Sequence, residues 1–193
     1  MAAVWWSSTL YPSEQFVEAC GAVVFDTSTE PKEILLLYYG AKDEWLLPKG
    51  RRNCDETRKD TVTREVLEET GYTIKLFPLT MSTRAPSMLE SADVKDVART
   101  YESLTEPFIL DVRDLGEGKG VKLVWWFIAE VGSFAGDGEP QFEPKFFPCD
   151  QAIERLTFKN DRDVLAKALE LMKNGISAES KFADGNIGLV LGG

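Results

Sequence analysis

The chain has 193 residues, of which 44% are hydrophobic, a formal net charge of −10 and no histidine. This length suits one well-buried core, and the acidic balance argues against broad nucleic-acid binding, which needs a basic surface. The lack of histidine excludes Ser-His-Asp and Cys-His catalysis and zinc sites with histidine ligands.

The cysteine pattern and the hydropathy indicate where the protein works. Cys20, Cys54 and Cys149 are widely spaced and include no CxxC pair, which is typical of reduced thiols in a reducing compartment. The first residues lack the basic and apolar segments of a signal peptide, and no apolar run reaches the roughly 18 residues that cross a bilayer. We expect a soluble protein without a membrane partner, in the cytoplasm or, as an alternative, the nucleus.

The first half of the chain alternates strand patterns with turn-forming residues. Residues 1–15 are expected to form a loose arm, pinned to the body by Trp5 and Trp6. Predicted next are strands at Phe16–Asp26, Glu33–Gly40 (buried on both faces) and Trp45–Leu47, a helix from Glu56 or Thr57 to Thr70, ended by Gly71, and a strand at Thr73–Thr80.

The second half begins with a polar stretch, Met81–Thr105, which we expect to be a long loop. Predicted after it are a hairpin of strands Glu106–Arg113 and Val121–Val131, a loop at Gly132–Pro144, an extended piece at Lys145–Pro148, and helices at Cys149–Leu156 and Asp161–Asn174, the second stopped at Asn174-Gly175. The expected fold is α+β, a mixed sheet flanked by helices. The expected domains are an N-terminal arm at 1–15, a single domain at 16–175 and a flexible C-terminal tail at 176–193.

The predicted central helix carries crowded carboxylates. Glu65, Glu68 and Glu69 are three and four residues apart, so they share one helix face, beside Val62 and Val66. Like charges at the edge of a core repel one another and are costly to desolvate. Mg²⁺ or Mn²⁺, which prefer oxygen ligands, would remove the conflict, and this indicates a metal-dependent phosphate enzyme.

The stretch from Gly50 to Tyr72 carries a longer pattern. It reads G-x5-E-x7-R-E-V-x-E-E-x-G-Y and resembles the Nudix box, with tyrosine at the closing position where an aliphatic residue is more usual. The resemblance implies an α/β/α sandwich and hydrolysis of a diphosphate X–P–P–Y by metal-activated water. A solvated, charged helix face is the alternative interpretation of REVLEE alone.

The resemblance also implies a role for individual residues. The Gly50 carbonyl, Glu65, Glu68 and Glu69 would hold one to three Mg²⁺ or Mn²⁺ ions, and Arg64 would orient Glu65 or Glu68. Glu56 would be mainly structural, capping the helix and fixing the loop. The general base would be Glu65 or, as in some relatives, a loop glutamate, for which the candidates are Glu143, Glu139, Glu102 and Glu106. Among these, Glu143 ranks second to Glu65.

Basic residues gather around the box in this acidic chain, namely Lys49, Arg51, Arg52, Arg58 and Lys59. They are either a solvated loop or a clamp for phosphates beyond the scissile pair, formed by Lys49, Arg51 and Arg52 and extended by Arg84, Lys122 or Lys145. Aromatic residues that are either core or a stacking site for a nucleobase are Tyr38, Tyr39, Trp45, Phe146 and Phe147.

The clamp favours substrates with many phosphates. The segment Pro48-Lys49-Gly50, which leads into the box, is similar to those of diadenosine polyphosphate and diphosphoinositol polyphosphate hydrolases. ADP-ribose, a nucleoside diphosphate-sugar or capped RNA are alternative substrates. A non-catalytic module that binds a phosphorylated ligand is the alternative outside enzymes. The sequence leaves the oligomeric state open.

Overall fold

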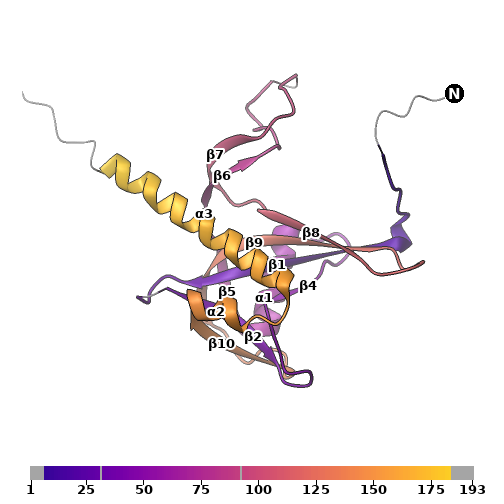
Figure 1. Cartoon of the computed structure of the whole chain (residues 1–193), viewed down its shortest axis with the longest axis vertical. Coiled ribbons are helices and arrows are strands. Elements are labelled where there is room, and N and C mark those ends of the chain that lie inside the picture. The colour runs from indigo at the N-terminus through magenta and orange to yellow at the C-terminus, as the bar shows by residue number, and fades with distance from the viewer. Residues whose placement is uncertain (1–6, 31, 92, 184–193) are drawn as a thin grey trace, which may run out of the picture.

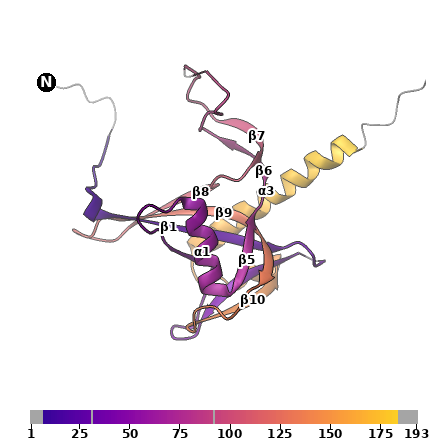
Figure 2. The same ribbon diagram turned by 180° about the vertical axis from the view of Figure 1, so that it is seen from behind.

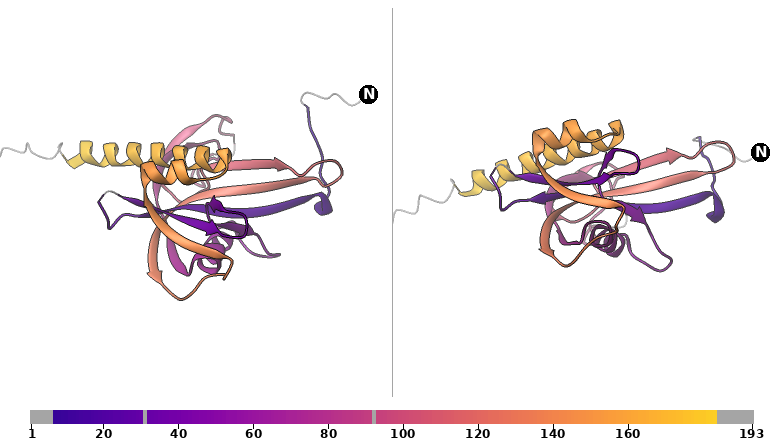
Figure 3. Two further views of the ribbon diagram at one scale, coloured as in Figure 1. Left: turned by 60° about the horizontal axis from the view of Figure 1, so that its bottom comes forward. Right: turned by 90° about the horizontal axis from the view of Figure 1, so that it is seen from below.

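The computed structural model describes residues 7–30, 32–91 and 93–183, which form three layers. One face of an eight-stranded sheet is covered by α2 (Cys149–Arg155) and α3 (Lys159–Ala183), and the opposite face by α1 (Arg58–Thr70). Figure 3 shows α3 and α1 on either side of the sheet, and Figure 1 shows α3 in front of it. The predicted α+β architecture is confirmed.

The sheet has strand order β10-β2-β1-β9-β5, with β3 added to β2, β4 to β1 and β8 to β9. Its strands are β1 (Phe16–Asp26), β2 (Glu33–Tyr39), β3 (Glu44–Leu46), β4 (Lys49–Arg51), β5 (Tyr72–Leu76), β8 (Ile109–Asp114), β9 (Val121–Phe134) and β10 (Phe142–Pro148). A short 3-10 turn, Ser13–Gln15, precedes β1. Since β1 and β9 run parallel while the other ladders are antiparallel, the sheet is mixed.

Side chains on the two faces of the sheet build two cores. The predicted burial of β2 on both faces is confirmed, because the four residues from Ile34 to Leu37 are all buried. One cluster packs against Val62 and Val66 of α1, and the other packs against α3 through Leu165 and Ala168. The carboxylate-bearing helix is thus anchored by its apolar strip.

Local signals fix both ends of α1. The Thr57 hydroxyl accepts a hydrogen bond from the Asp60 amide at 3.2 Å and caps the N-terminus. Gly71 adopts a left-handed φ of 75° and donates its N–H to the Leu67 carbonyl, which ends the helix as predicted. A Cβ there would lie 1.9 Å from the Gly136 carbonyl oxygen, so the loop before β10 packs directly on this cap.

The region after β5 differs from the prediction. The expected strand Thr73–Thr80 is two strands, β5 and β6 (Leu79–Thr83), because Pro78 between them has no N–H to donate to a ladder. The expected loop Met81–Thr105 contains the rest of β6 and β7 (Arg99–Leu104), which form a separate two-stranded sheet. This hairpin projects from the main sheet (Figures 1 and 2).

The last helix is longer than predicted. It continues through Gly175 to Ala183, so the expected stop at Asn174-Gly175 is wrong. One interior glycine costs a helix only about 1 kcal/mol relative to alanine, and the good helix formers Ala178, Glu179 and Lys181 follow. Trp5, Trp6 and residues 184–193 lie outside the described residues, and the division into arm, domain and tail stays a prediction. In the described part of the chain, no helix combines the length and apolar character needed to span a membrane.

Candidate active site

The Glu65 side chain lies directly on Gly50. Strand β4 pairs with β1 so that Gly50 is opposite Cys20, on the sheet face that α1 covers. A Cβ on Gly50 would lie 1.6 Å from Oε2 of Glu65, a distance that no side chain could occupy. Glycine at this position therefore lets the carboxylate of α1 reach the backbone of β4.

Arg64 joins the carboxylates of the box. Its Nη1 donates to Oε1 of Glu65 at 2.7 Å and to Oε2 of Glu68 at 2.8 Å, while Nε donates to Oε1 of Glu56 at 2.7 Å. Its Nη2 donates to the Arg51 carbonyl at 3.0 Å. The hydrogen bonds with Glu56, and then those with Glu65 and Glu68, raise the pKa of Arg64. The guanidinium thus sets the positions of three carboxylates and one loop carbonyl.

Glu56 holds the loop that leads into α1. Its Oε2 accepts hydrogen bonds from the Asn53 amide at 3.0 Å and from the Thr61 hydroxyl at 2.9 Å. The hydrogen bonds from Arg64 are the main cause that lowers the pKa of Glu56 to about 2. These contacts agree with the structural role expected for Glu56.

Two of the box carboxylates are removed from water. Burial raises the pKa of Glu65, against the opposing effect of Arg64. Burial also raises the pKa of Glu69 to about 8, although Oε2 of Glu69 accepts the Lys49 amide at 2.7 Å. Glu68 is about half exposed, at 49% of its side chain. Glu65 and Glu69 are thus carboxylates whose ionised forms need more positive charge than the protein provides.

This donor set fits a hard divalent cation. Within the described ranges, no three carboxylates or thiols are arranged closely enough to hold a metal ion, and Arg64 lies between Glu65 and Glu68. The fit rests instead on chemistry: buried carboxylate oxygens converge on the backbone of β4, and oxygen ligands suit Mg²⁺ and Mn²⁺. We call Gly50, Glu65, Glu68 and Glu69 the carboxylate cradle.

The structure separates the two loop candidates for the general base. The predicted loop Gly132–Pro144 is shorter than expected, since β9 runs to Phe134 and β10 begins at Phe142. Strand alternation turns Phe146 toward α1 and therefore turns Glu143 to the opposite face, where it pairs with Lys145 at 3.0 Å. Glu143 is not brought to the cradle.

Glu139 is the loop glutamate that reaches the cradle. Its amide donates to the Glu68 carbonyl at 2.7 Å, so the loop before β10 lies along the end of α1. Its charge contributes to raising the pKa values of Glu65 and Glu69. The other two candidates lie elsewhere: Glu106 pairs with Lys59 at 2.9 Å, and Glu102 is an exposed residue of β7.

Two of the basic residues near the box, Arg52 and Arg58, are bonded to a carboxylate within the protein. Nε of Arg52 donates to Glu18 at 2.9 Å, and Nη2 of Arg58 donates to the same carboxylate at 2.7 Å. Trp125 Nε1 is a third donor to Glu18 at 2.9 Å, and the Arg58 guanidinium lies 3.9 Å above its ring. Arg52, predicted to bind substrate, holds the loop against β1, and no local pattern in the sequence indicates its pairing with Glu18.

We expect Glu18→Gln to destabilise the fold by about 1–3 kcal/mol at pH 7, the cost of leaving charged hydrogen-bond donors without a carboxylate. Burial opposes ionisation of Glu18, but Arg58, Trp125 and Arg52 outweigh it, so its pKa is below the ordinary 4.5. A carboxyl whose pKa is lower in the folded than in the unfolded state stabilises the fold at pH values above its ordinary pKa. This stabilisation is lost as the pH falls through the pKa of the folded state.

Urea unfolding at several pH values measures this effect. The difference between wild type and Glu18→Gln should be constant from pH 6 to 8 and shrink below about pH 4.5, the ordinary pKa. The exposed Glu14, two residues before β1, provides a matched Glu→Gln control without an effect. A difference that grows toward acid pH would contradict this account of Glu18.

The structure does not bring Arg84 to the cradle. Arg84 follows β6 in the projecting hairpin, where Nε and Nη2 donate to the Asp96 carboxylate at 2.9 and 2.6 Å. Both side chains are exposed. Lys59, also in the predicted basic group, is paired with Glu106 and Thr105. Lys49 and Arg51, also predicted to bind substrate phosphates, flank Gly50 on β4.

The aromatic residues proposed for stacking pack mainly on one another. Trp45 lies 4.9 Å from Tyr38 and 5.0 Å from Phe147, centroid to centroid, and Arg155 covers Phe147 at 4.5 Å. Tyr39 packs on Phe142 in the same way. Trp45 and Phe147 also pack against the core, and Tyr38 and Tyr39 are partly buried.

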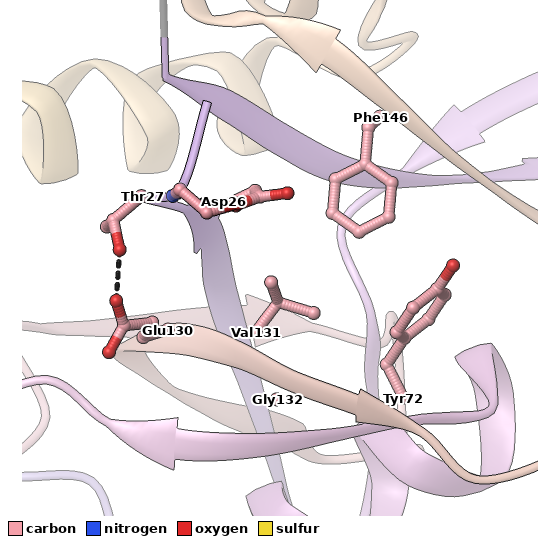
Figure 4. A pocket seen from close by; sticks show the side chains of 8 residues that line it. Asp26, Thr27, Tyr72, Glu130, Val131, Gly132 and Phe146 are labelled. Carbon is pink, nitrogen blue, oxygen red and sulfur yellow. Dashed lines mark hydrogen bonds between the residues drawn. The ribbon is translucent and has the colours of Figure 1, made fainter. Parts of the chain in front are cut away.

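Phe146 lines a separate hollow of about 290 Å³ at the far end of β1. Figure 4 shows Phe146 and Tyr72 on one side of it, and Thr27 with a hydrogen bond to Glu130 on the other. Asp26 adds a second carboxylate, and no basic side chain is among the lining residues. A hollow with this charge repels phosphate, so phosphates must bind elsewhere.

In the assembled site, the carboxylates of α1 dock on Gly50 of β4 and are organised by Arg64. The chain belongs to the NUDIX family, whose domain model matches residues 15–169. Among curated proteins it is 27% identical, over 171 residues, to the 8-oxo-(d)GTP phosphatase of Mycolicibacterium smegmatis. That alignment covers 82% of this chain and 43% of the relative, so the chain spans less than half of that protein's length.

Solved structures share the fold at low sequence identity. A NUDIX hydrolase from Nitrosomonas europaea aligns with a TM-score of 0.54 and 15% identity, over 80% of this chain and 88% of that chain. The Ap4A hydrolase of C. elegans aligns with a TM-score of 0.52 and 17% identity, over 81% of this chain and 98% of that chain. The expected Nudix sandwich is thereby confirmed.

Proposed function

We propose that the chain hydrolyses a phosphoanhydride bond in a substrate X–P–P–Y by attack of water on phosphorus, with Mg²⁺ or Mn²⁺. The observation that carries this proposal is the Glu65 carboxylate seated on Gly50 and hydrogen-bonded to Arg64. The Gly50 carbonyl, Glu65, Glu68 and Glu69 would hold the metal. When bound, the metal lowers the pKa of water and neutralises charge on the phosphates.

The protein's own groups would position the reactants and move the proton. Arg64 fixes Glu65 and Glu68 in place through its Nη1, which limits the motion of the carboxylates in the cradle. The proton of the attacking water would pass to a carboxylate, since the chain has no histidine. We assign this role to Glu65 and retain Glu139, which lies beside it, as the second candidate.

For the substrate we propose a dinucleoside polyphosphate or a diphosphoinositol polyphosphate. Lys49 and Arg51 support this choice, because these two cations flank Gly50 on β4. The name of the M. smegmatis relative favours a second candidate, an oxidised purine nucleoside triphosphate. Both candidates contain more phosphates than the scissile pair. We expect this reaction to occur in the cytoplasm or nucleus.

A substrate panel tests the proposal. Diadenosine tetraphosphate, an inositol pyrophosphate, 8-oxo-dGTP and ADP-ribose would be incubated with Mg²⁺ or Mn²⁺, in water enriched in ¹⁸O. We expect turnover of a polyphosphate substrate and one ¹⁸O atom in a phosphate product. Turnover of ADP-ribose alone would contradict the proposed substrate class. Tight binding without turnover of any substrate would identify a ligand-binding module instead of an enzyme.

A further inference from the structure

Four basic side chains share the sheet face opposite the one that carries the cradle. Within β4, Lys49 and Arg51 alternate with Gly50, so they point away from the face that α1 covers. A Cβ on Gly21 would lie 2.6 Å from the Cβ of Lys49 and 2.5 Å from the Trp126 ring, which places the Lys49 stem on the Trp126 side. The register of β8 and β9 puts Arg113 and Lys122 on that same face.

Arg113 and Lys122 face each other directly across two strands. They are partners in the antiparallel ladder of β8 and β9. Side chains at such positions lie about 5 Å apart at Cβ, and like charges there are destabilising. Burial, together with the charges of Lys49, Arg113 and Arg51, lowers the pKa of Lys122. This arrangement weakens the fold in the absence of an anion.

The carboxylates nearby hold Arg113 and leave the other cations without partners. Arg113 Nε donates to Asp111 at 2.7 Å, and its Nη2 lies 3.6 Å from Oδ1 of Asp161, which is only 2% exposed. In the part of the chain that the structure describes, the side chains of Lys49, Arg51 and Lys122 form no ion pair or hydrogen bond. The group contains four cations and two carboxylates, in a chain whose net charge is −10.

The basic group and the cradle lie on opposite faces of the sheet and meet at β4. The Lys49 amide donates to Oε2 of Glu69 at 2.7 Å, and Lys49 and Arg51 directly flank Gly50 in β4. Among the described strands, β4 pairs with β1 alone, so a phosphate chain that leaves the cradle would reach these cations around the other edge of β4.

We propose that Lys49, Arg51, Arg113 and Lys122 form a seat for the phosphates that extend beyond the scissile pair, so that this site selects densely phosphorylated substrates. The inference rests on the proposed function for what happens at the cradle, but the seat itself requires only anion binding. A substrate with two phosphates would leave the seat empty. A linear polyphosphate or a ring with several phosphates would fill it.

Calorimetry of anion binding without divalent metal, in EDTA, tests the seat apart from catalysis. The probes are inorganic tripolyphosphate for a linear chain and inositol hexakisphosphate for a ring. Lys122→Met and Arg51→Gln each remove one cation, and Arg51 is exposed, so the second variant keeps the core intact. Lys75→Gln, at an exposed position of β5, is the matched control.

We expect the affinity for at least one probe to fall about 10- to 100-fold in both variants and to be unchanged in Lys75→Gln, as for a lost charge-assisted hydrogen bond. The probe that shows the loss identifies a linear or a ring arrangement. Equal affinities of the wild type and both seat variants for both probes would overturn the proposal.

Kinetics separates failure of the seat from failure of the proposed function. Lys122→Met should lower kcat/KM more for a substrate with four phosphates than for a diphosphate substrate, and Lys75→Gln should change neither. Loss of probe affinity with no turnover of any substrate would support the seat while contradicting the proposed hydrolase. Equal losses of kcat/KM on both substrates would overturn the selective role of the seat.

Discussion

Replacing Glu65 with glutamine is expected to lower kcat by about 10³-fold, in the range found when a general base is removed. The substitution keeps the shape of the side chain and its hydrogen-bonding length, so the contact with Gly50 survives. It removes the charge that Arg64 holds and the group proposed to accept the proton of water. The measurement is kcat at saturating Mg²⁺ on the polyphosphate that the panel identifies.

Two further glutamine variants decide which carboxylate is the base. Glu139→Gln tests the loop glutamate beside the cradle, and we expect it to lower kcat by less than tenfold, since general base catalysis contributes at least about 10². Glu143→Gln serves as the control, because Glu143 lies on the opposite face with Lys145. A loss of about 10³ in Glu139→Gln with only a minor loss in Glu65→Gln would move the base to the loop.

The parts of the site that could be predicted are those encoded over short distances. Helical spacing alone places Glu65, Glu68 and Glu69 on one face. Gly71 ends α1 as expected, whereas the helix begins at Arg58, after the Thr57 cap, and not at Glu56 or Thr57. Each of these inferences needs only a few neighbouring residues, which is why the shared face of the carboxylates could be predicted from the sequence.

The partners of the basic residues could not be predicted in this way. Whether Arg52 and Arg58 are free for substrate depends on Glu18, which is 34 and 40 residues away in sequence. Basic side chains near the Nudix box look alike in the sequence. Only the pairing of β1 with β4 distinguishes an arginine that braces the loop from one that is free to bind phosphate.

Strand phase explains the other differences. The position at which β10 begins decides which face Glu143 occupies, and a shift of one residue would reverse it. The pairing of Arg113 with Lys122 likewise follows from the register of β8 and β9. A hairpin was predicted there, but the turn DLGEGKG did not specify its register, so Arg113 was not a candidate.

Replacing Gly50 with alanine is expected to remove most activity and to lower the free energy of unfolding by about 1–3 kcal/mol, as for an overpacked contact. The new Cβ would lie 1.6 Å from Oε2 of Glu65, so the carboxylate must move away. A displacement of about 1 Å at a reacting group can cost about 10² in rate. The measurements are kcat and urea unfolding.

Two comparisons isolate the cause. At Gly40, an added Cβ would meet only Tyr38 at 3.6 Å, an ordinary contact, so Gly40→Ala is a matched control. Because the clash involves the Glu65 side chain, the destabilisation by Gly50→Ala should largely disappear in a background that carries Glu65→Ala. If Gly50→Ala destabilised both backgrounds equally, the glycine would serve the backbone of β4, and its role in seating Glu65 would be rejected.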